Sequence, residues 1–248
     1  MELLGIDIGG SGIKGALVDI ETGQLTTDRH RIDTPQPATP QAVAGVVKEL
    51  VDHFNWKGPV GCGLPSVVLH GVAQTASNID EGWIGTNAEA LLHAETGLPF
   101  KVVNDADAAG LAEAAFGGGR NQHGLIMVLT IGTGIGSAII ADGKLIPNTE
   151  LGHLRFKGGI AEKYAADSIR KKEGLPWEEW AVRLDEYLNH VYKLFYPDML
   201  ILGGGVSKKF ERYQHKLEVP CPIQPAELLN QAGIIGAALA AQAHVKVV

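Results

Sequence analysis

An α/β fold in two related lobes is what the sequence predicts, because one pattern occurs twice along the chain. A strand, a glycine-rich turn and a second strand are expected at 3–18, and the same order returns at 125–140. Apolar residues at helical spacing in 43–51 place a helix after the first of these hairpins. Strands that alternate with helices in a repeated order are typical of an α/β protein.

The boundary between the lobes is expected near Asn104, after the apolar strand 100–103. This gives an N-terminal α/β lobe of residues 1–104 and a C-terminal α/β lobe of residues 105–248. A helix rich in small residues is expected over 233–243. Because small side chains allow close packing, this last helix can return to the N-terminal lobe.

Composition and charge exclude several classes of protein. Of the 248 residues, 45% are hydrophobic and 20% charged, and the formal net charge is -7, which argues against a nucleic-acid partner. No apolar run reaches the roughly 20 residues of a membrane span. The N-terminus lacks a basic segment followed by an apolar one, so we expect a cytoplasmic protein with no membrane partner. Cys62 and Cys221 do not show metal-ligand spacing, so no zinc site is expected.

The first candidate phosphate-binding motif, residues 7–15, ends the first strand and reads Asp-Ile-Gly-Gly-Ser-Gly-Ile-Lys-Gly. Glycines let backbone N–H groups approach a phosphate closely, and the serine and lysine add donors. Asp7 is expected to hold a Mg2+ ion, through water, near the transferred phosphoryl group. A plain glycine hairpin with an acidic residue at its mouth is the alternative. The expected donor-binding residues are Gly9, Gly10, Ser11, Gly12 and Lys14.

A second glycine-rich motif occupies residues 130–136. Its Gly-x-Gly-x-Gly order is similar to a dinucleotide fingerprint, but 137–141 reads as a strand where that unit requires a helix. Hydride transfer is therefore disfavoured, and a second phosphate-binding hairpin is expected. Its donor-binding residues are Thr130, Gly132, Thr133 and Gly134.

A third glycine turn follows the strand 199–202. Gly204 and Gly205 in this turn can accept a nucleotide base or ribose lying flat on the backbone. The alternative is a plain strand-to-helix turn.

Polar groups suited to sugar hydroxyls stand at two places. Asp105 follows a strand, and a carboxylate there can accept a hydroxyl proton as the oxygen attacks phosphorus, while Asn104 can fix another hydroxyl. The alternative for this pair is a helix cap. Glu150 and His153, with Glu162 further along, offer acceptors for several hydroxyls of one sugar. A metal site formed by this glutamate and histidine is a rival interpretation, but no third ligand stands nearby in a metal-binding pattern. Plain surface charge is a further alternative.

These ordered motifs, from Gly5 to about Gly236, resemble the kinases of the ROK (repressor, open reading frame, kinase) family, and within it the polyphosphate glucokinases. The resemblance implies a two-lobed actin-like ATPase (ribonuclease H-like) fold with a ligand cleft between the lobes. It implies a homodimer that phosphorylates the 6-hydroxyl of glucose from inorganic polyphosphate or ATP with Mg2+. It makes Asp105 the general base. It places sugar contacts at Ser66, Asn78, Asn104, Asp105, Glu150, His153 and Glu162.

Three features favour the polyphosphate branch of that family. Most of the wider family carries a zinc-binding cysteine cluster after the Gly-His motif, whereas residues 154–165 contain no cysteine, and 77–85 is similar to the polyphosphate branch. A local basic cluster also suits a polyanionic donor. A solvated helix face balanced by acidic residues is the alternative interpretation of this cluster. It comprises Lys157, Lys163, Arg170, Lys171 and Lys172.

Three other functions stay open at this point. An ATP-dependent glucokinase or mannokinase would use the same residues, although the short segment 208–225 lies where the resemblance places an adenosine pocket. A sugar-responsive regulator is disfavoured because the first hairpin begins at Asp7, which leaves no room for a DNA-reading module. An assembly protein of the actin kind would leave Asp105, Glu150 and His153 without an evident task.

Overall fold

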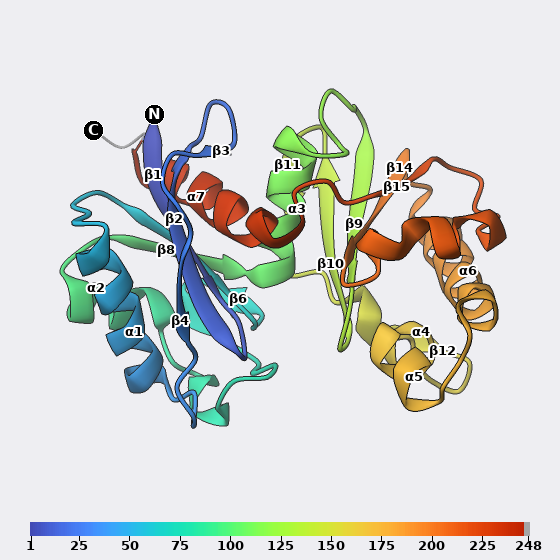
Figure 1. Ribbon diagram of the computed structural model, residues 1–248, viewed down its shortest axis with the longest axis horizontal. Coiled ribbons are helices and arrows are strands. Elements are labelled where there is room, and N and C mark those ends of the chain that lie inside the picture. Colours follow the sequence, from blue (N-terminus) through green and yellow to red (C-terminus); the bar gives the residue numbers. More distant parts are fainter. Residues whose placement is uncertain (246–248) are drawn as a thin grey trace. The chain divides into compact units, whose positions relative to one another are not determined.

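The computed structural model describes residues 1–245, and the contacts within the chain divide it into two units (Figure 1). Unit 1 comprises Met1–Ala112 together with the segment that begins at Asn230. Unit 2 comprises Glu113–Leu229. Each unit has its own sheet and its own hydrophobic core.

Unit 1 is built on a six-stranded sheet with the order β3-β2-β1-β5-β8, and β4 also pairs with β2. β1 and β2 form an antiparallel hairpin, whereas β5 and β8 continue the sheet from β1 in parallel. The carboxyl ends of β1, β5 and β8 therefore meet at one edge of this sheet. The strands are β1 (Glu2–Ile8), β2 (Gly12–Asp19), β3 (Gln24–Leu25), β4 (His30–Asp33), β5 (Val60–Leu64) and β8 (Phe100–Asn104).

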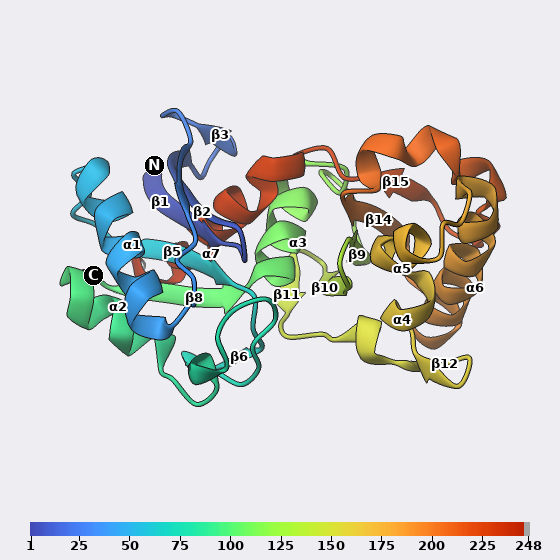
Figure 2. The same cartoon turned by 60° about the horizontal axis from the view of Figure 1, so that its bottom comes forward.

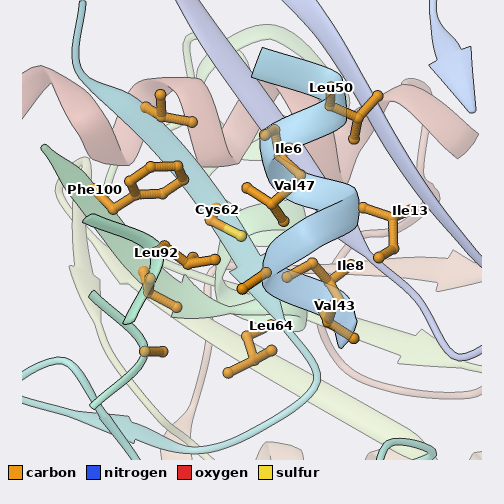
Figure 3. Close-up of a cluster of buried hydrophobic side chains, with 14 of the residues drawn as sticks. Ile6, Ile8, Ile13, Val43, Val47, Leu50, Cys62, Leu64, Leu92 and Phe100 are labelled. Carbon is orange, nitrogen blue, oxygen red and sulfur yellow. The ribbon is translucent and has the colours of Figure 1, made fainter. Parts of the chain in front are cut away.

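Helix α1 (Pro40–His53) covers one face of this sheet, as the close-up of the core shows (Figure 3). The helix begins where Thr39 accepts a hydrogen bond from the amide of Ala42, and a proline occupies its first turn, as helix starts favour. Val43 and Val47 from α1 pack in the same buried cluster as Ile6 from β1. Helix α2 (Ala88–Thr96) packs beside α1.

The opposite face of the sheet carries helix α7 (Ala232–Val245), which passes behind β1 and β5 (Figure 3). Side chains alternate along a strand, so Gly5 faces α7 while its neighbours in β1 face α1. A Cβ atom at Gly5 would collide with the carbonyl of Ile234, and one at Gly61 would collide with the carbonyl of Ala237. The two glycines thus let the α7 backbone lie directly on the sheet.

Unit 2 contains a five-stranded sheet with the order β11-β10-β9-β14-β15. β9 and β10 form an antiparallel hairpin, and β14 pairs with β9 in parallel. Helix α6 (Trp177–Phe195) buries Trp180 and Leu184 in the same cluster as Met127 and Leu129 from β9. The strands are β9 (Leu125–Ile131), β10 (Ile135–Ala141), β11 (Lys144–Ile146), β14 (Met199–Gly204) and β15 (Ile223–Pro225).

The remaining elements are short, apart from helix α3 (Asp105–Phe116). Figure 2 shows α4 and α5 beside α6. No helix in the described part of the chain has the length and apolarity that crossing a membrane requires. The short elements are β6 (Val68–Leu69), β7 (Val72–Ala73), η1 (Glu81–Trp83), η2 (Leu151–His153), β12 (Arg155–Phe156), β13 (Gly159–Ile160), α4 (Glu162–Ala165), α5 (Asp167–Lys172), η3 (Ser207–Arg212), η4 (Gln214–Lys216) and η5 (Leu229–Gln231).

The repeated pattern predicted from the sequence is present: each unit has a glycine-turn hairpin that is extended by a parallel strand. The division of the chain differs from the boundary expected near Asn104. It falls inside α3, after Ala112, because the first part of that helix packs with unit 1, where Ala108 lies against Gly236 of α7. The segment from Asn230 belongs to unit 1 for the same reason, since α7 lies on β1 and β5.

Candidate functional site

The first glycine hairpin of unit 1 is held by side chains from β4 and the segment after it. Thr34 donates its hydroxyl to the Gly9 carbonyl at 2.5 Å, and the Arg31 guanidinium donates to the Ser11 carbonyl at 2.7 Å. The Gln36 amide donates to the carbonyl of Gly10 at 3.3 Å. These bonds fix the turn from the carbonyl side. Sequence reasoning recognised residues 34–40 only as a proline-rich connection and missed this role.

Asp7 stands at the end of β1, directly opposite Lys14 in the hairpin register. The Lys14 ammonium lies 3.3 Å from one carboxylate oxygen of Asp7, and the two side chains are 26% and 19% exposed. A Cβ built on Gly63 would lie 3.9 Å from the other carboxylate oxygen and 3.7 Å from the Cα of Asp105. The carboxylate of Asp7 and the backbone of Asp105 thus border the same glycine, as expected where parallel strands end together.

Asn104 ends β8 and caps helix α3. Its side-chain oxygen accepts from the amides of Ala106 at 2.8 Å and Asp107 at 3.1 Å, and its amide donates to the Ser66 carbonyl at 3.0 Å. Asn104 is buried and acts as a helix cap, which is the alternative that the sequence offered for this residue. Asp105 is exposed, and one of its carboxylate oxygens accepts from the Ala106 amide at 2.8 Å.

The other two sugar contacts expected in unit 1 have different surroundings. Ser66 is 2% exposed and donates its hydroxyl to backbone carbonyls, including that of Thr75 at 2.7 Å, so its hydroxyl stabilises the loop after β5. Asn78 is exposed, has a left-handed backbone with φ of 61°, and lies against Gly10, where a Cβ would come within 2.8 Å of the Asn78 carbonyl. The first glycine hairpin and Asn78 are therefore neighbours.

The second glycine hairpin, in unit 2, is held from α4 and α5. The Ser168 amide donates to the Gly132 carbonyl at 3.0 Å, and its hydroxyl donates to the Thr133 carbonyl at 2.6 Å. Glu162 accepts from the amide of Ile135 at 3.4 Å and lies against Gly134. Sequence reasoning missed Ser168.

Glu150, His153 and Glu162 come together in unit 2, as the sequence predicts. His153 Nδ1 lies 3.4 Å from a carboxylate oxygen of Glu150, and its Nε2 lies 4.0 Å from one of Glu162. Burial raises the pKa of the Glu150 carboxyl above its ordinary value; the nearby Glu162 charge also raises it, and His153 opposes the shift. Two carboxylates and an imidazole thus form one cluster of hydrogen-bonding groups.

Gly204 has a structural reason to be glycine. Its φ is 77°, and a Cβ there would lie 2.8 Å from the Ile131 amide nitrogen, so β14 and β9 approach each other closely at this point. The Ser207 hydroxyl donates to the Gly204 carbonyl at 2.9 Å. A Cβ at Gly205 would meet no atom within 4 Å. The turn fits the simpler strand-to-helix interpretation as well as nucleotide binding.

Much of the basic cluster is paired with carboxylates. Lys157 binds Glu186 at 2.8 Å, and Arg170 and Lys171 both bind Asp167 at 2.7 Å. These pairs agree with a charge-balanced surface. Among the described residues, no group of three or more histidine, cysteine, aspartate and glutamate side chains is arranged to hold a metal ion.

Comparison with known proteins identifies relatives across almost the whole chain. The ROK family model matches residues 3–167. The chain is 51% identical to the polyphosphate glucokinase of Mycobacterium tuberculosis (strain ATCC 25618 / H37Rv) over 96% of this chain and 91% of that protein. The crystal structure of the inorganic polyphosphate/ATP-glucomannokinase from Arthrobacter sp. strain KM has a TM-score of 0.92 and 48% identity, and the match covers 98% of this chain and 99% of that one. A ROK family glucokinase from Streptomyces griseus, at 24% identity and a TM-score of 0.82, shares the fold.

A duplicated glycine hairpin on an α/β sheet, with Asp7 and Asp105 at strand ends, defines the class of sugar kinases with the actin-like ATPase fold. The expected fold class is thereby confirmed. The chain belongs to the ROK family.

Proposed function

We propose that the protein transfers a phosphoryl group to the 6-hydroxyl of glucose, with inorganic polyphosphate, ATP or both as donor. The observation that carries this proposal is the placement of Asp7 and Asp105 on either side of Gly63, in a chain half identical to polyphosphate glucokinases. Asp7 can then act at the donor phosphates, while Asp105 acts at the attacking hydroxyl.

Asp105 acts as the general base in this proposal. It is exposed at the first turn of α3, so its carboxylate can reach a sugar hydroxyl and take the proton as the oxygen attacks phosphorus. Asn104 is buried, and its bonds to the α3 amides and to the Ser66 carbonyl hold the start of the helix. Ser66 supports that arrangement, because its carbonyl accepts from the Asn104 amide and its hydroxyl donates to the Thr75 carbonyl.

The sugar is proposed to bind through Glu150, His153 and Glu162, together with Asn78 and Asn104. The carboxylates accept hydrogen bonds from sugar hydroxyls, and the imidazole can donate or accept. The contacts of Glu162 with Gly134 and with the Ile135 amide connect the sugar-binding cluster to the second glycine hairpin.

The donor phosphates are proposed to bind the two glycine hairpins, with Gly204 and Gly205 available to an ATP ribose. Mg2+ would sit near Asp7. Gly233 packs directly against this carboxylate, because a Cβ there would lie 2.9 Å from the Asp7 carboxylate carbon. A single carboxylate fits a Mg2+ ion that keeps several waters and takes its other ligands from the donor phosphates. When bound, the ion neutralises charge on those phosphates.

Mannose is a second candidate acceptor, because the Arthrobacter relative at 48% identity is a glucomannokinase. We further propose that the protein is a cytoplasmic homodimer in carbohydrate metabolism and binds no nucleic acid. Size-exclusion chromatography with light scattering would test the dimer, since a monomer at working concentration would contradict it.

A direct assay tests the proposed function. Purified protein with Mg2+ is given glucose or mannose, and either long-chain polyphosphate or ATP as sole donor, while the sugar 6-phosphate is quantified. We expect turnover of glucose with polyphosphate. Turnover with ATP alone would remove polyphosphate from the proposal, and no product in any of the four combinations would overturn it.

The raised pKa of Glu150 predicts a pH dependence of sugar affinity. Because this carboxyl takes up its proton at a higher pH than an ordinary glutamate, its charged form is lost earlier as the pH falls from 7. We expect kcat/KM for glucose to fall on the acid side, mainly through KM. Glu150→Gln should raise KM at pH 7 and flatten this acid limb. An unchanged limb in the variant would assign the titration to another group.

A further inference from the structure

The segment between His153 and Glu162 contains a hairpin with an unusual turn. β12 and β13 pair over only two residues each, and the turn between them places Lys157 at φ of 51° and Gly158 at φ of 82°. Two successive positive φ values suit a tight hairpin turn, but a lysine in the first position is uncommon because side chains disfavour this backbone. A lysine at this position therefore calls for an explanation from the contacts of its side chain.

Lys157 reaches a carboxylate on α6, and a second residue reaches the same carboxylate. The ammonium of Lys157 lies 2.8 Å from Oε1 of Glu186, and the hydroxyl of Tyr164 donates to Oε2 at 2.6 Å. The Arg183 guanidinium, also on α6, lies 5.2 Å from the centre of the Tyr164 ring. Lys157 precedes Glu162 in the chain and Tyr164 follows it, so Glu186 holds the chain on both sides of the proposed sugar ligand.

Helix α4, which begins at Glu162, is poorly stabilised by its own residues. It has four residues, and its N-cap, Ala161, provides no side-chain hydrogen bond. A helix of one turn does not persist in isolation. It is anchored from α6: the Trp180 indole donates to the Ala165 carbonyl at 2.9 Å, and Glu186 binds Tyr164. The orientation of the Glu162 carboxylate therefore depends on anchors outside α4.

The geometry assigns Glu186 as a positioning residue that orients Glu162 for the sugar, an inference that rests on the proposed role of Glu162. Glu186 and Lys157 are 37% and 47% exposed, and ion pairs this exposed contribute little to stability. Replacing Glu186 should therefore affect sugar binding more than folding. The glutamate itself has no contact with the reacting atoms in this assignment.

The test compares Glu186→Ala, Glu186→Gln and Tyr164→Phe with the wild type, with glucose and polyphosphate varied separately. Without Glu186 the Glu162 carboxylate is expected to shift from the position that binds the sugar. We therefore expect Glu186→Ala to raise the glucose KM about tenfold. The polyphosphate KM and the Tm should stay close to wild type. Glu186→Gln, which keeps an acceptor for Tyr164, should restore part of the glucose KM. Glu179→Ala, an exposed glutamate on the same helix, is the matched control.

Amide hydrogen exchange gives a readout that does not depend on the substrate. The amides of Tyr164 and Ala165 donate to the Ala161 carbonyl, and they should exchange faster in Glu186→Ala than in wild type or in Glu179→Ala. Unchanged exchange and unchanged glucose KM in Glu186→Ala would overturn the positioning role, as would an equal change in all kinetic constants with a large loss of Tm.

Glu162→Gln, measured in parallel, separates this inference from the proposed function. If Glu162→Gln raises the glucose KM and Glu186→Ala does not, the positioning role fails and the sugar site stands. If Glu162→Gln leaves the glucose KM unchanged, the proposed sugar site and the inference both fail.

Discussion

Replacing Asp105 by asparagine is expected to reduce kcat by about 10²–10⁴, the usual contribution of a general base. Asparagine keeps a side-chain oxygen that can accept from the Ala106 amide, as Asp105 does at 2.8 Å, so α3 should still begin at the same residue. The dissociation constant of glucose should change by less than about threefold, because loss of the base affects the transition state more than the bound sugar. Single-turnover kinetics and calorimetric titration with glucose would measure the two quantities.

The matched control for this experiment is Asp52→Asn. Asp52 is an aspartate on the surface of α1, 63% exposed and paired with Lys48 at 2.9 Å, so its replacement removes the same charge away from the strand ends. We expect kcat within about twofold of wild type, as for a surface substitution with little energetic effect. Turnover of Asp105→Asn close to that of Asp52→Asn would contradict the assignment of the base.

The parts of the fold that the sequence predicts are those set by local signals. A strand, a glycine turn and a strand can be recognised from neighbouring residues, and both hairpins formed where expected, around Gly10 and Gly132. The grouping of Glu150, His153 and Glu162 was also predicted, because the three residues lie close together in the sequence, and the resemblance to a family placed the same residues at the sugar.

Contacts between residues far apart in the chain could not be predicted from local signals. Glu113 shows this most clearly: it is 1% exposed, and its carboxylate accepts from the amides of Gly118, Glu227 and Leu228. Nothing near Glu113 in the sequence distinguishes it from a glutamate on a helix surface. Burial of such a charge is tolerated only where backbone donors surround it, and those donors are set by the tertiary fold.

Asn104 illustrates a different limit. Sequence reasoning named both a sugar contact and a helix cap for this residue, and the structure shows the cap together with a bond to the Ser66 carbonyl. One side chain can serve local structure and still border a site. The choice between such roles needs the positions of residues from other strands, which periodicity does not supply.

Gly61→Ala is expected to lower the free energy of unfolding by about 3 kcal/mol, at the upper end of the range for overpacked cores. Gly61 lies in β5, and a Cβ there would collide with the Ala237 carbonyl and lie 3.0 Å from the Ala238 amide nitrogen. Both obstacles are backbone atoms of α7, so no side-chain rotation can relieve the contact, and the helix must shift from the sheet. Urea denaturation followed by circular dichroism would measure the change.

The same substitution at Gly45 separates packing from the general effect of adding a methyl group. Gly45 lies in α1 and is exposed, and a Cβ added there would meet no atom within 4 Å. Gly45→Ala should therefore stabilise the protein by about 0.5–1 kcal/mol through helix propensity. The two variants are expected to change stability in opposite directions. If Gly61→Ala were as stable as wild type, α7 could move away from β5 without cost, and the glycine would not be explained by the close approach of the helix.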